Sequence, residues 1–261
     1  MRNPPTLPKW GQGLVGLAAL VVMLELLPRV GVVSPTYLPP FSTMVQALFE
    51  ELGQAQFWSA LADTVTAWAI GLAIAMVLGI TVGVVIGSIP VLRAITASTI
   101  EFLRPIPSVA LIPLVVLVFG NKIESSLTLI VYASFWQVLI QVLYGVQDVD
   151  PVVRETARSY RFGAWTQVRH VIWPTALPYV MTGFRLAATV ALVLAITAEL
   201  VIGIPGLGYE IAQAQSAGNV PSMYALVLVT GVLGVLVNLV ARALERRVLA
   251  WHPSLRGEVY A

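Results

Sequence analysis

The sequence predicts an all-α integral membrane protein with six transmembrane helices and one ordered polar loop. Three observations predict this fold class. Hydrophobic residues make up 58% of the 261 residues and charged residues only 11%, whereas a soluble domain has roughly a quarter charged residues. The mean hydropathy is +0.86. Finally, the apolar residues fall into six long stretches, and the polar interruption at 148–177 carries helical periodicity of its own.

The six stretches approach the length of about 20 residues that a membrane helix needs. The predicted spans are 10–27, 59–87, 98–119, 125–146, 178–202 and 223–248 within a single transmembrane domain, 1–261. The first span follows Arg2 and Lys9, as the apolar part of a signal peptide would. Because Pro28 and Arg29 do not form a small-residue cleavage site, we expect a retained span.

The third span contains three prolines, Pro105, Pro107 and Pro113. A proline inside a membrane helix leaves backbone carbonyl groups without partners. We therefore expect this span to be kinked and to pack against protein rather than lipid.

Basic residues set the orientation of the spans. Six spans place both termini on one side of the membrane, and cytoplasmic segments are enriched in Lys and Arg. With the termini inside, 13 of the 15 basic residues lie at or near the cytoplasmic face, and only Arg29 and Lys122 lie outside. The N and C termini and the polar loop 148–177 are thus predicted to be cytoplasmic.

The first half of the polar loop has the pattern of a short amphipathic helix. Asp150 and Pro151 are typical of a helix start. An apolar stripe and a basic stripe then recur at helical spacing; they consist of Val153, Ala157 and Tyr160, and of Arg154, Arg158 and Arg161. Glu155 is placed to pair with Arg158.

The second half of the loop predicts another short helix after a turn at Gly163. This helix, 164–173, places Trp165, Val168 and Ile172 on one side and Arg169 on the other; Pro174 is expected to end it, and Pro178 to open the next span. Such a loop suits a docking element for a soluble partner. The alternative is a charged connector that binds anionic lipid headgroups.

Several classes of function are disfavoured by what the sequence lacks. It has no cysteine and only two distant histidines, so we expect no metal site. A net charge of +2 gives no reason to expect nucleic acid. No catalytic triad or carboxylate pair suggests an enzyme. No G-x-x-x-x-G-K-[ST] loop is present, so we expect no ATP on this chain and no other cofactor.

The polar loop resembles the EAA loop of ABC-transporter permeases of the binding-protein-dependent type. That pattern is Glu-Ala-Ala, a glycine six residues after the glutamate, and a hydrophobic stretch that ends in proline. Glu155, Ala157 and Pro174 match it, but Arg161 occupies the glycine position. Either the turn is shifted to Gly163, or Arg161 adopts a left-handed conformation at a cost of about 1–2 kcal/mol.

This resemblance implies a set of partners in the cell membrane of a prokaryote. They are a second permease subunit (homodimer and heterodimer stay open), two ATPase subunits that hold ATP and Mg²⁺, an extracytoplasmic solute-binding protein and membrane lipid. The implied ATPase-coupling residues are Glu155, Ala157, Arg158, Arg161, Gly163, Trp165, Val168, Arg169 and Pro174. Among these we expect Glu155, Ala157 and Gly163 to maintain the fold of the loop, and Trp165 and Val168, with Ile172, to seat in the ATPase.

Three further segments resemble the nitrate/sulfonate/taurine-type subfamily. They are LRPIPSVALIPLVVLVFG at 103–120, AELVIGIPGLGY at 198–209 and LERRVLAWHP at 244–253. The implied substrate is a small anion such as a sulfonate, taurine or nitrate, with a pyrimidine precursor or another small organic solute as the alternative. A secondary transporter is the alternative class, and it would predict inverted repeats and more acidic residues within the membrane.

Polar residues within the spans are candidates for a pathway or gate. They are Glu199, Gln137, Gln141 and Ser134. For Glu199 the alternative is a carboxylate held by a neighbouring helix, and for the other three it is hydrogen bonding between helices. Glu101 and Arg104 are expected to form a structural ion pair. Arg185 is the only arginine within a span proper that could serve an anion pathway.

Two outer segments and a glycine pattern complete the expectations. Ser42 is expected to cap a short helix that ends near Gln56. Residues 203–222 form either a connector or an external gate under a delivery protein. Gly71, Ala75 and Gly79 recur every four residues, which favours close helix packing within one subunit or across a dimer.

Overall fold

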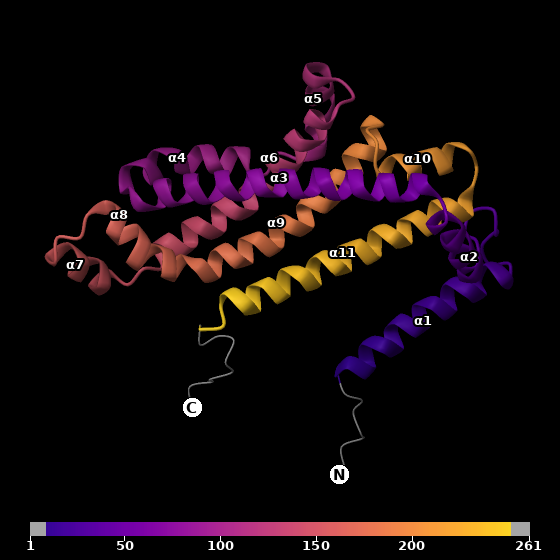
Figure 1. Ribbon diagram of the computed structural model, residues 1–261, viewed down its shortest axis with the longest axis horizontal. Coiled ribbons are helices and arrows are strands. Elements are labelled where there is room, and N and C mark those ends of the chain that lie inside the picture. Colours follow the sequence, from indigo (N-terminus) through magenta and orange to yellow (C-terminus); the bar gives the residue numbers. More distant parts are fainter. Residues whose placement is uncertain (1–8, 252–261) are drawn as a thin grey trace, which may run out of the picture.

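The computed structural model describes residues 9–251, and all regular elements in this range are helices (Figure 1). The predicted positions of Arg2, His252 and Arg256 lie outside the described residues. In chain order the elements are α1 (Lys9–Arg29), α2 (Phe41–Leu52), α3 (Ala55–Ser88), α4 (Pro90–Leu103), η1 (Ser108–Leu111), α5 (Ile112–Phe119), α6 (Ile123–Gln147), α7 (Pro151–Ser159), α8 (Ala164–Gln167), η2 (Val168–Ile172), α9 (Trp173–Ile202), α10 (Leu207–Ser216) and α11 (Val220–Val248).

Five helices of the described range are long and apolar enough to cross a membrane, and a sixth span exists if one bent pair is counted. The five are Gly11–Arg29, Ala55–Ser88, Ile123–Gln147, Ala164–Ile202 and Val220–Val248. The bent pair consists of Pro90–Leu103 and Ser108–Phe119, whose axes meet at 81°. An all-helical, multi-pass membrane protein is thus confirmed, and the third predicted span is its irregular member.

The core lies where α3, α6 and α9 run side by side (Figure 1). Glycines of α3 face β-branched residues of α6 along the whole contact: Gly71 lies against Ile130, Gly79 against Val138, Gly83 against Val142 and Gly87 against Val146. A Cβ atom added to Gly79 would lie 2.7 Å from the Cβ of Val138. The glycine spacing therefore serves packing within one chain, a choice that the sequence pattern left open.

The break in the third span follows from its prolines. In an unbroken helix the carbonyl of Leu103 would accept from the backbone N–H of residue 107, but Pro107 has none. This carbonyl accepts instead from the Ile106 N–H at 3.2 Å and from the Tyr132 hydroxyl of α6 at 2.8 Å. The predicted kink is thus present, and the expected packing against protein is met in part. In α5, Ile112 and Val115 are buried, whereas α4 has no fully buried residue in this chain and packs only Ile100 and Leu103 against α6.

The fifth predicted span begins much earlier than expected. Pro174 does not end a helix and Pro178 does not open one, because α8, η2 and α9 form one continuous run, Ala164–Ile202. The segment η2 is a π-helix in which the Trp173 N–H donates to the Val168 carbonyl, five residues earlier. This wider turn directly precedes Pro174, whose ring would otherwise clash with the preceding turn of an α-helix.

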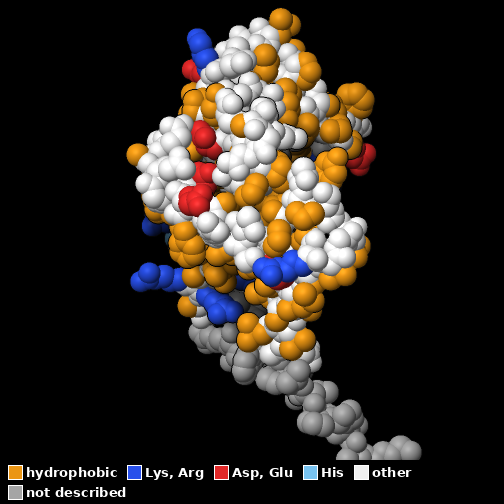
Figure 2. Space-filling model, turned by 90° about the vertical axis from the view of Figure 1, so that its right-hand side faces the viewer, with side chains coloured by type: hydrophobic (Ala, Val, Ile, Leu, Met, Phe, Trp, Pro, Cys, Tyr) orange, Lys and Arg blue, Asp and Glu red, His pale blue; other side chains and the backbone are white. Residues whose placement is uncertain are grey.

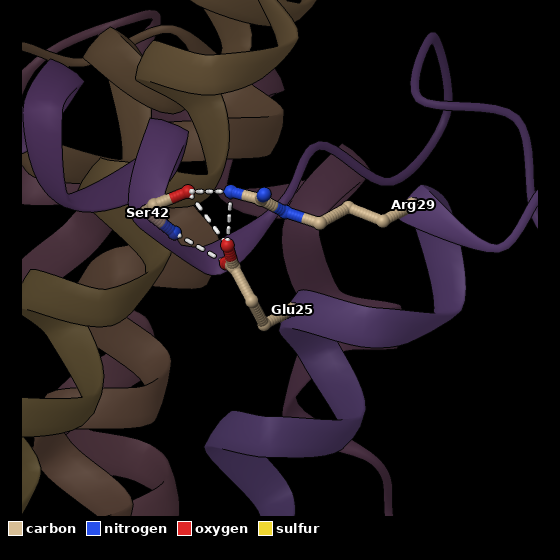
Figure 3. Close-up of polar contacts among 3 residues, drawn as sticks. All are labelled: Glu25, Arg29 and Ser42. Atoms are coloured by element: carbon tan, nitrogen blue, oxygen red, sulfur yellow. Dashed lines mark hydrogen bonds and ion pairs between the residues drawn. The ribbon is translucent and has the colours of Figure 1, made fainter.

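The connection between α1 and α2 differs from the predicted cap. Pro40, not Ser42, is the N-cap of α2. Figure 3 shows Glu25 of α1 accepting hydrogen bonds from the Ser42 backbone N–H at 2.8 Å and the Ser42 hydroxyl at 3.0 Å. Arg29 pairs with the same carboxylate. A carboxylate from α1 thus satisfies the free Ser42 N–H group in the first turn of α2.

We predict that Gly79→Ala destabilises the chain by about 1–3 kcal/mol, because the added methyl group must displace Val138 or separate α3 from α6. Thermal unfolding in detergent measures the effect. Gly231→Ala on α11 is the matched control, since a Cβ there meets nothing within 4 Å. Equal melting temperatures for the two variants would contradict the role of the glycine contact.

Candidate functional site

Two polar regions lie at opposite ends of the bundle. In Figure 1, α7 and α8 form the left-hand end, and α2 and α10 form the right-hand end. A third polar region lies between them at the break of the bent pair. Each region contains residues that the sequence singled out, so each is considered in turn.

The first short helix of the loop, α7, has the predicted start. The Asp150 carboxylate accepts a hydrogen bond from the Val152 N–H at 2.7 Å, and Pro151 occupies the first turn. At the other end, Arg161 N–H donates to the Arg158 carbonyl and Phe162 N–H to the Ala157 carbonyl. This pair of bonds is the Schellman motif, which requires a left-handed residue just after the helix.

Arg161 is that left-handed residue, with φ +52°. Gly163 has φ −63° and ψ 160°, an ordinary extended conformation, and a Cβ atom there would meet nothing. The turn therefore lies at the position where the EAA pattern has glycine, and the expectation of a turn at Gly163 is wrong. Gly163 is the N-cap residue of α8 instead.

The loop is held to the bundle by buried side chains and by two polar contacts. Ala157 and Ile172 are buried, and Val168 packs partly against the main core. The Arg154 guanidinium donates to the Val146 carbonyl of α6 at 3.0 Å, and the Tyr179 hydroxyl of α9 donates to the Asp148 carboxylate at 2.9 Å. The loop is thus attached to both α6 and α9.

The outward side of the loop is apolar and basic. Trp165 and Tyr160 are each 75% exposed, and Arg158, Arg161 and Arg169 are also exposed. Tyr160 therefore does not join an inward stripe with Ala157. Ile172 is buried in its own bundle, so the expectation that it seats in a partner is wrong.

Two further loop expectations are not met in the structure. Glu155 is exposed, and the ion pairs of the described residues are Glu25–Arg29 and Arg185–Glu245, so Glu155 does not pair with Arg158. Pro174 lies within the first turn of α9 and is partly buried.

A cavity of about 210 Å³ lies at the break between α4 and η1. Its polar lining consists of Arg104, Ser108, Tyr132, Trp136 and Gln137. The Nε1–H donor of Trp136 is buried without an acceptor. Arginine and indole groups donate hydrogen bonds only, and hydroxyl and amide groups can do so. No acidic residue of the described range lines the cavity, and this set of donors suits an anion.

This cavity contains one of the four predicted pathway residues, Gln137. Ser134 instead donates to the Ala187 carbonyl of α9 at 3.3 Å, which is a contact between helices. Gln141 packs at the close approach of α6 to Gly183 and does not line the cavity. The prolines signalled the break, but which residues of α6 face it could not be read from the sequence.

The expected roles of Arg104 and Arg185 are reversed. Arg104 was expected to pair with Glu101, but it lines the cavity and is not in an ion pair in the described range. Arg185 pairs with Glu245 of α11 at 3.2 Å. The arginine available to an anion is therefore Arg104.

Glu199 is held by neighbouring elements near the right-hand end of the bundle. Its Oε2 atom accepts from the Thr64 hydroxyl of α3 at 2.9 Å and from the Gly208 N–H at 3.0 Å. Thr64 in turn accepts from the Leu207 N–H at 2.9 Å. Together the two side chains satisfy the first N–H groups of α10, a role for Thr64 that no sequence signal indicated. One carboxylate oxygen is thus used to attach α10 to the bundle.

The comparison with known families agrees with this arrangement. The sequence profile described as "Binding-protein-dependent transport system inner membrane component" matches residues 75–250, which include the cavity, the loop and Glu199. The chain belongs to this family. Its relatives are permease subunits of ABC transporters, which are transport components rather than catalysts.

Three relatives show how far the likeness to other members of this permease family extends. The putative aliphatic sulfonates transport permease SsuC of Bacillus subtilis is 30% identical over 95% of this chain and 90% of that protein. The taurine transport permease TauC of Escherichia coli is 32% identical over 93% and 89%. The bicarbonate transport permease CmpB of Synechococcus elongatus is 29% identical over 95% of each.

Solved structures share the fold of this permease family member. A chain of a bacterial ABC transporter involved in alginate import superposes with a TM-score of 0.64 at 16% identity, covering 91% of this chain and 96% of that one. A chain of an amino acid ABC transporter gives 0.61 at 22% identity, covering 79% and 98%. At these identities the likeness concerns the fold alone.

We predict that Arg161→Gly stabilises α7, because glycine removes the left-handed strain of about 1–2 kcal/mol while adding flexibility to the unfolded chain. A net gain of up to about 1 kcal/mol is expected. Hydrogen exchange of the α7 backbone amides measures this stabilisation, which we expect to slow the exchange. Gly163→Ala is the control and should not speed exchange; faster exchange in that variant would place the turn at Gly163.

Proposed function

We propose that this chain is the transmembrane subunit of an ABC importer for a small anion, driven by ATPase subunits that dock on the loop 148–177. Family membership supports the transporter class. The observation that supports the docking role is the combination, on this one loop, of a highly exposed tryptophan with three exposed arginines, Arg158, Arg161 and Arg169, that form no ion pair within residues 9–251. Exposed aromatic and arginine side chains are typical of protein interfaces.

The proposed orientation places α7 and α8 in the cytoplasm. Four arginines lie in the loop, and three more, Arg242, Arg246 and Arg247, lie near the end of α11. Segments rich in basic residues stay on the cytoplasmic side. Figure 2 views the opposite end, where a group of acidic side chains lies near the middle of the face and Lys and Arg side chains lie above and below it. The helices at this end, α2 and α10, carry Glu50, Glu51 and Glu210. This acidic end would face the solute-binding protein.

Coupling follows from the continuity of α8, η2 and α9. A partner that binds Trp165 and displaces it would displace α9 as well, because Ala164–Ile202 is one continuous helical run. The bonds Arg154–Val146 and Asp148–Tyr179 carry the same movement to α6 and α9. Closure of two ATPase subunits would in this way reorient the helices around the cavity. A second permease subunit would complete the pathway.

We predict that Trp165→Ala weakens assembly with the ATPase by about 2 kcal/mol or more, since a buried interface tryptophan contributes energy of that order. Co-purification of the ATPase with the tagged permease measures assembly, and ATP-driven uptake measures coupling. Tyr37→Ala is the matched control, because Tyr37 is 76% exposed and precedes α2 at the opposite end. Uptake that persists without any ATPase would support a secondary transporter instead.

The cavity at the break supports an anionic substrate. Arg104 supplies a positive charge and Trp136 a buried donor without an acceptor. Its volume of about 210 Å³ exceeds the roughly 30 Å³ that one water molecule occupies in the liquid, so a small solute fits. The names of three relatives refer to sulfonates, taurine and bicarbonate, which include negatively charged species. We therefore include a sulfonate, taurine or nitrate among the proposed substrates.

We predict that Arg104→Gln lowers uptake of the transported anion about tenfold or more, because a charge-assisted hydrogen bond contributes about 1.5–3 kcal/mol. The loss is measured as uptake into proteoliposomes that contain the full complex. The labelled substrates are taurine, an alkyl sulfonate, nitrate and bicarbonate. Arg242→Gln is the control, because Arg242 is exposed on α11 and does not line the cavity. Undiminished anion uptake by Arg104→Gln would refute the assignment of this cavity.

A further inference from the structure

A second polar cavity lies at the end of the bundle that carries α10. It encloses about 180 Å³ between α3, the start of α6 and the turn that follows α9. Its polar lining consists of Asp63, Thr66, Asn121, Ser126 and Glu199. Neither the coupling loop nor the cavity at the break contributes a residue to it.

Two buried oxygen atoms of this lining have no hydrogen-bond partner. They are Oε1 of Glu199 and Oγ of Ser126. The Glu199 residue is only 1% exposed and Ser126 is 0% exposed. The bonds from Thr64 and Gly208 go to the other carboxylate oxygen, Oε2. Buried polar atoms are almost always satisfied, so two such atoms beside one cavity point to a bound species.

The polar lining of this second cavity favours a cation over an anion or an apolar ligand. Every polar side chain offers an oxygen atom, and two of the residues are acidic. No Lys or Arg among the described residues lines the cavity. Carboxylate, hydroxyl and amide oxygens are the ligands that hard cations prefer. An anion would meet two carboxylates there, and an apolar ligand would leave both buried oxygen atoms unsatisfied.

We propose that this cavity binds a hard metal cation, Na⁺ or Ca²⁺, through Glu199 Oε1 and Ser126 Oγ. Asp63, Thr66 and Asn121 supply further oxygen ligands from the exposed side of the cavity. The cation joins α3, α6 and α9, and it acts on the same carboxylate whose other oxygen holds the start of α10. Occupancy therefore stabilises the connection between α9 and α10.

The test is thermal unfolding of the full chain in nanodiscs of uncharged phosphatidylcholine. We compare three salt conditions at equal ionic strength: NaCl, CaCl₂ supplemented with choline chloride, and choline chloride alone. Choline serves as the reference cation, since it is too large and too apolar to replace a coordinated cation. Binding to the folded state raises the melting temperature. We expect a rise in NaCl or in CaCl₂ relative to choline chloride alone, and the salt that produces it identifies the cation.

Two variants locate the site. Glu199→Gln keeps an acceptor for Thr64 and Gly208 but loses the carboxylate charge, and Ser126→Ala removes a hydroxyl that makes no hydrogen bond. Each should weaken the cation affinity about tenfold or more, because removal even of outer groups at metal sites has effects of that size. Thr128→Ala is the control, since Thr128 is exposed on α6 and bonds only its own helix.

Two results would overturn the proposal. Equal melting temperatures of the wild-type chain in all three salts would mean that water or a proton satisfies Glu199. A rise that persists in Ser126→Ala and in Glu199→Gln would place the cation elsewhere. If Glu199→Gln does not fold, Ser126→Ala decides alone. The readout is the stability of this chain, so it is independent of transport.

Discussion

The close contact between α3 and α6 is the constraint on which the rest of the structure depends. Four glycines of α3 lie against the side chains of Ile130, Val138, Val142 and Val146 of α6. The two backbones therefore approach more closely than a side chain at these positions of α3 would permit. In a membrane such packing drives helix association, because lipid is as apolar as the side chains and burial alone gives little. This contact fixes the position of α6. It therefore decides that Tyr132, Trp136 and Gln137 line the cavity at the break and that Ser126 lines the same cavity as Glu199.

Backbone groups at irregular points of the helices account for several of the polar contacts. The carbonyl of Leu103 accepts from the Tyr132 hydroxyl in addition to the Ile106 N–H. The first N–H groups of α10 donate to Thr64 and Glu199, and the Ser42 N–H donates to Glu25. Lipid offers no hydrogen bonds, so a broken helix in a membrane must find partners in the protein. The two polar cavities lie beside the breaks for the same reason, since irregular backbone and side-chain donors or acceptors collect there.

The continuous run through α8, η2 and α9 connects the regions proposed to act in transport. It carries Trp165 at one end and Glu199 near the other, and Val190 between them lines the cavity at the break. The helix continues through Pro174 by way of the π-helical turn. A displacement of the loop would therefore reach the cavity through one continuous helical run, whereas α7 is attached more lightly, by the buried Ala157 and by the hydrogen bond of Arg154.

The sequence by itself determined the fold class, the approximate position of most of the long apolar helices, the proline break, the Asp150 cap and the permease family, because these depend on composition, periodicity and local spacing. It did not determine the helix that passes through Pro174 and Pro178, since a π-helical turn has no simple sequence signature. Only the tertiary structure decided that Arg161 forms the turn, that Arg104 rather than Arg185 faces a cavity, and that Thr64 meets Glu199. The Arg161 turn is local, but its choice over Gly163 is visible only in the hydrogen bonds that end α7. The other two outcomes depend on which residues distant in sequence become neighbours, and the fit of the glycines of α3 to the β-branched residues of α6 positions the helices that bring them together.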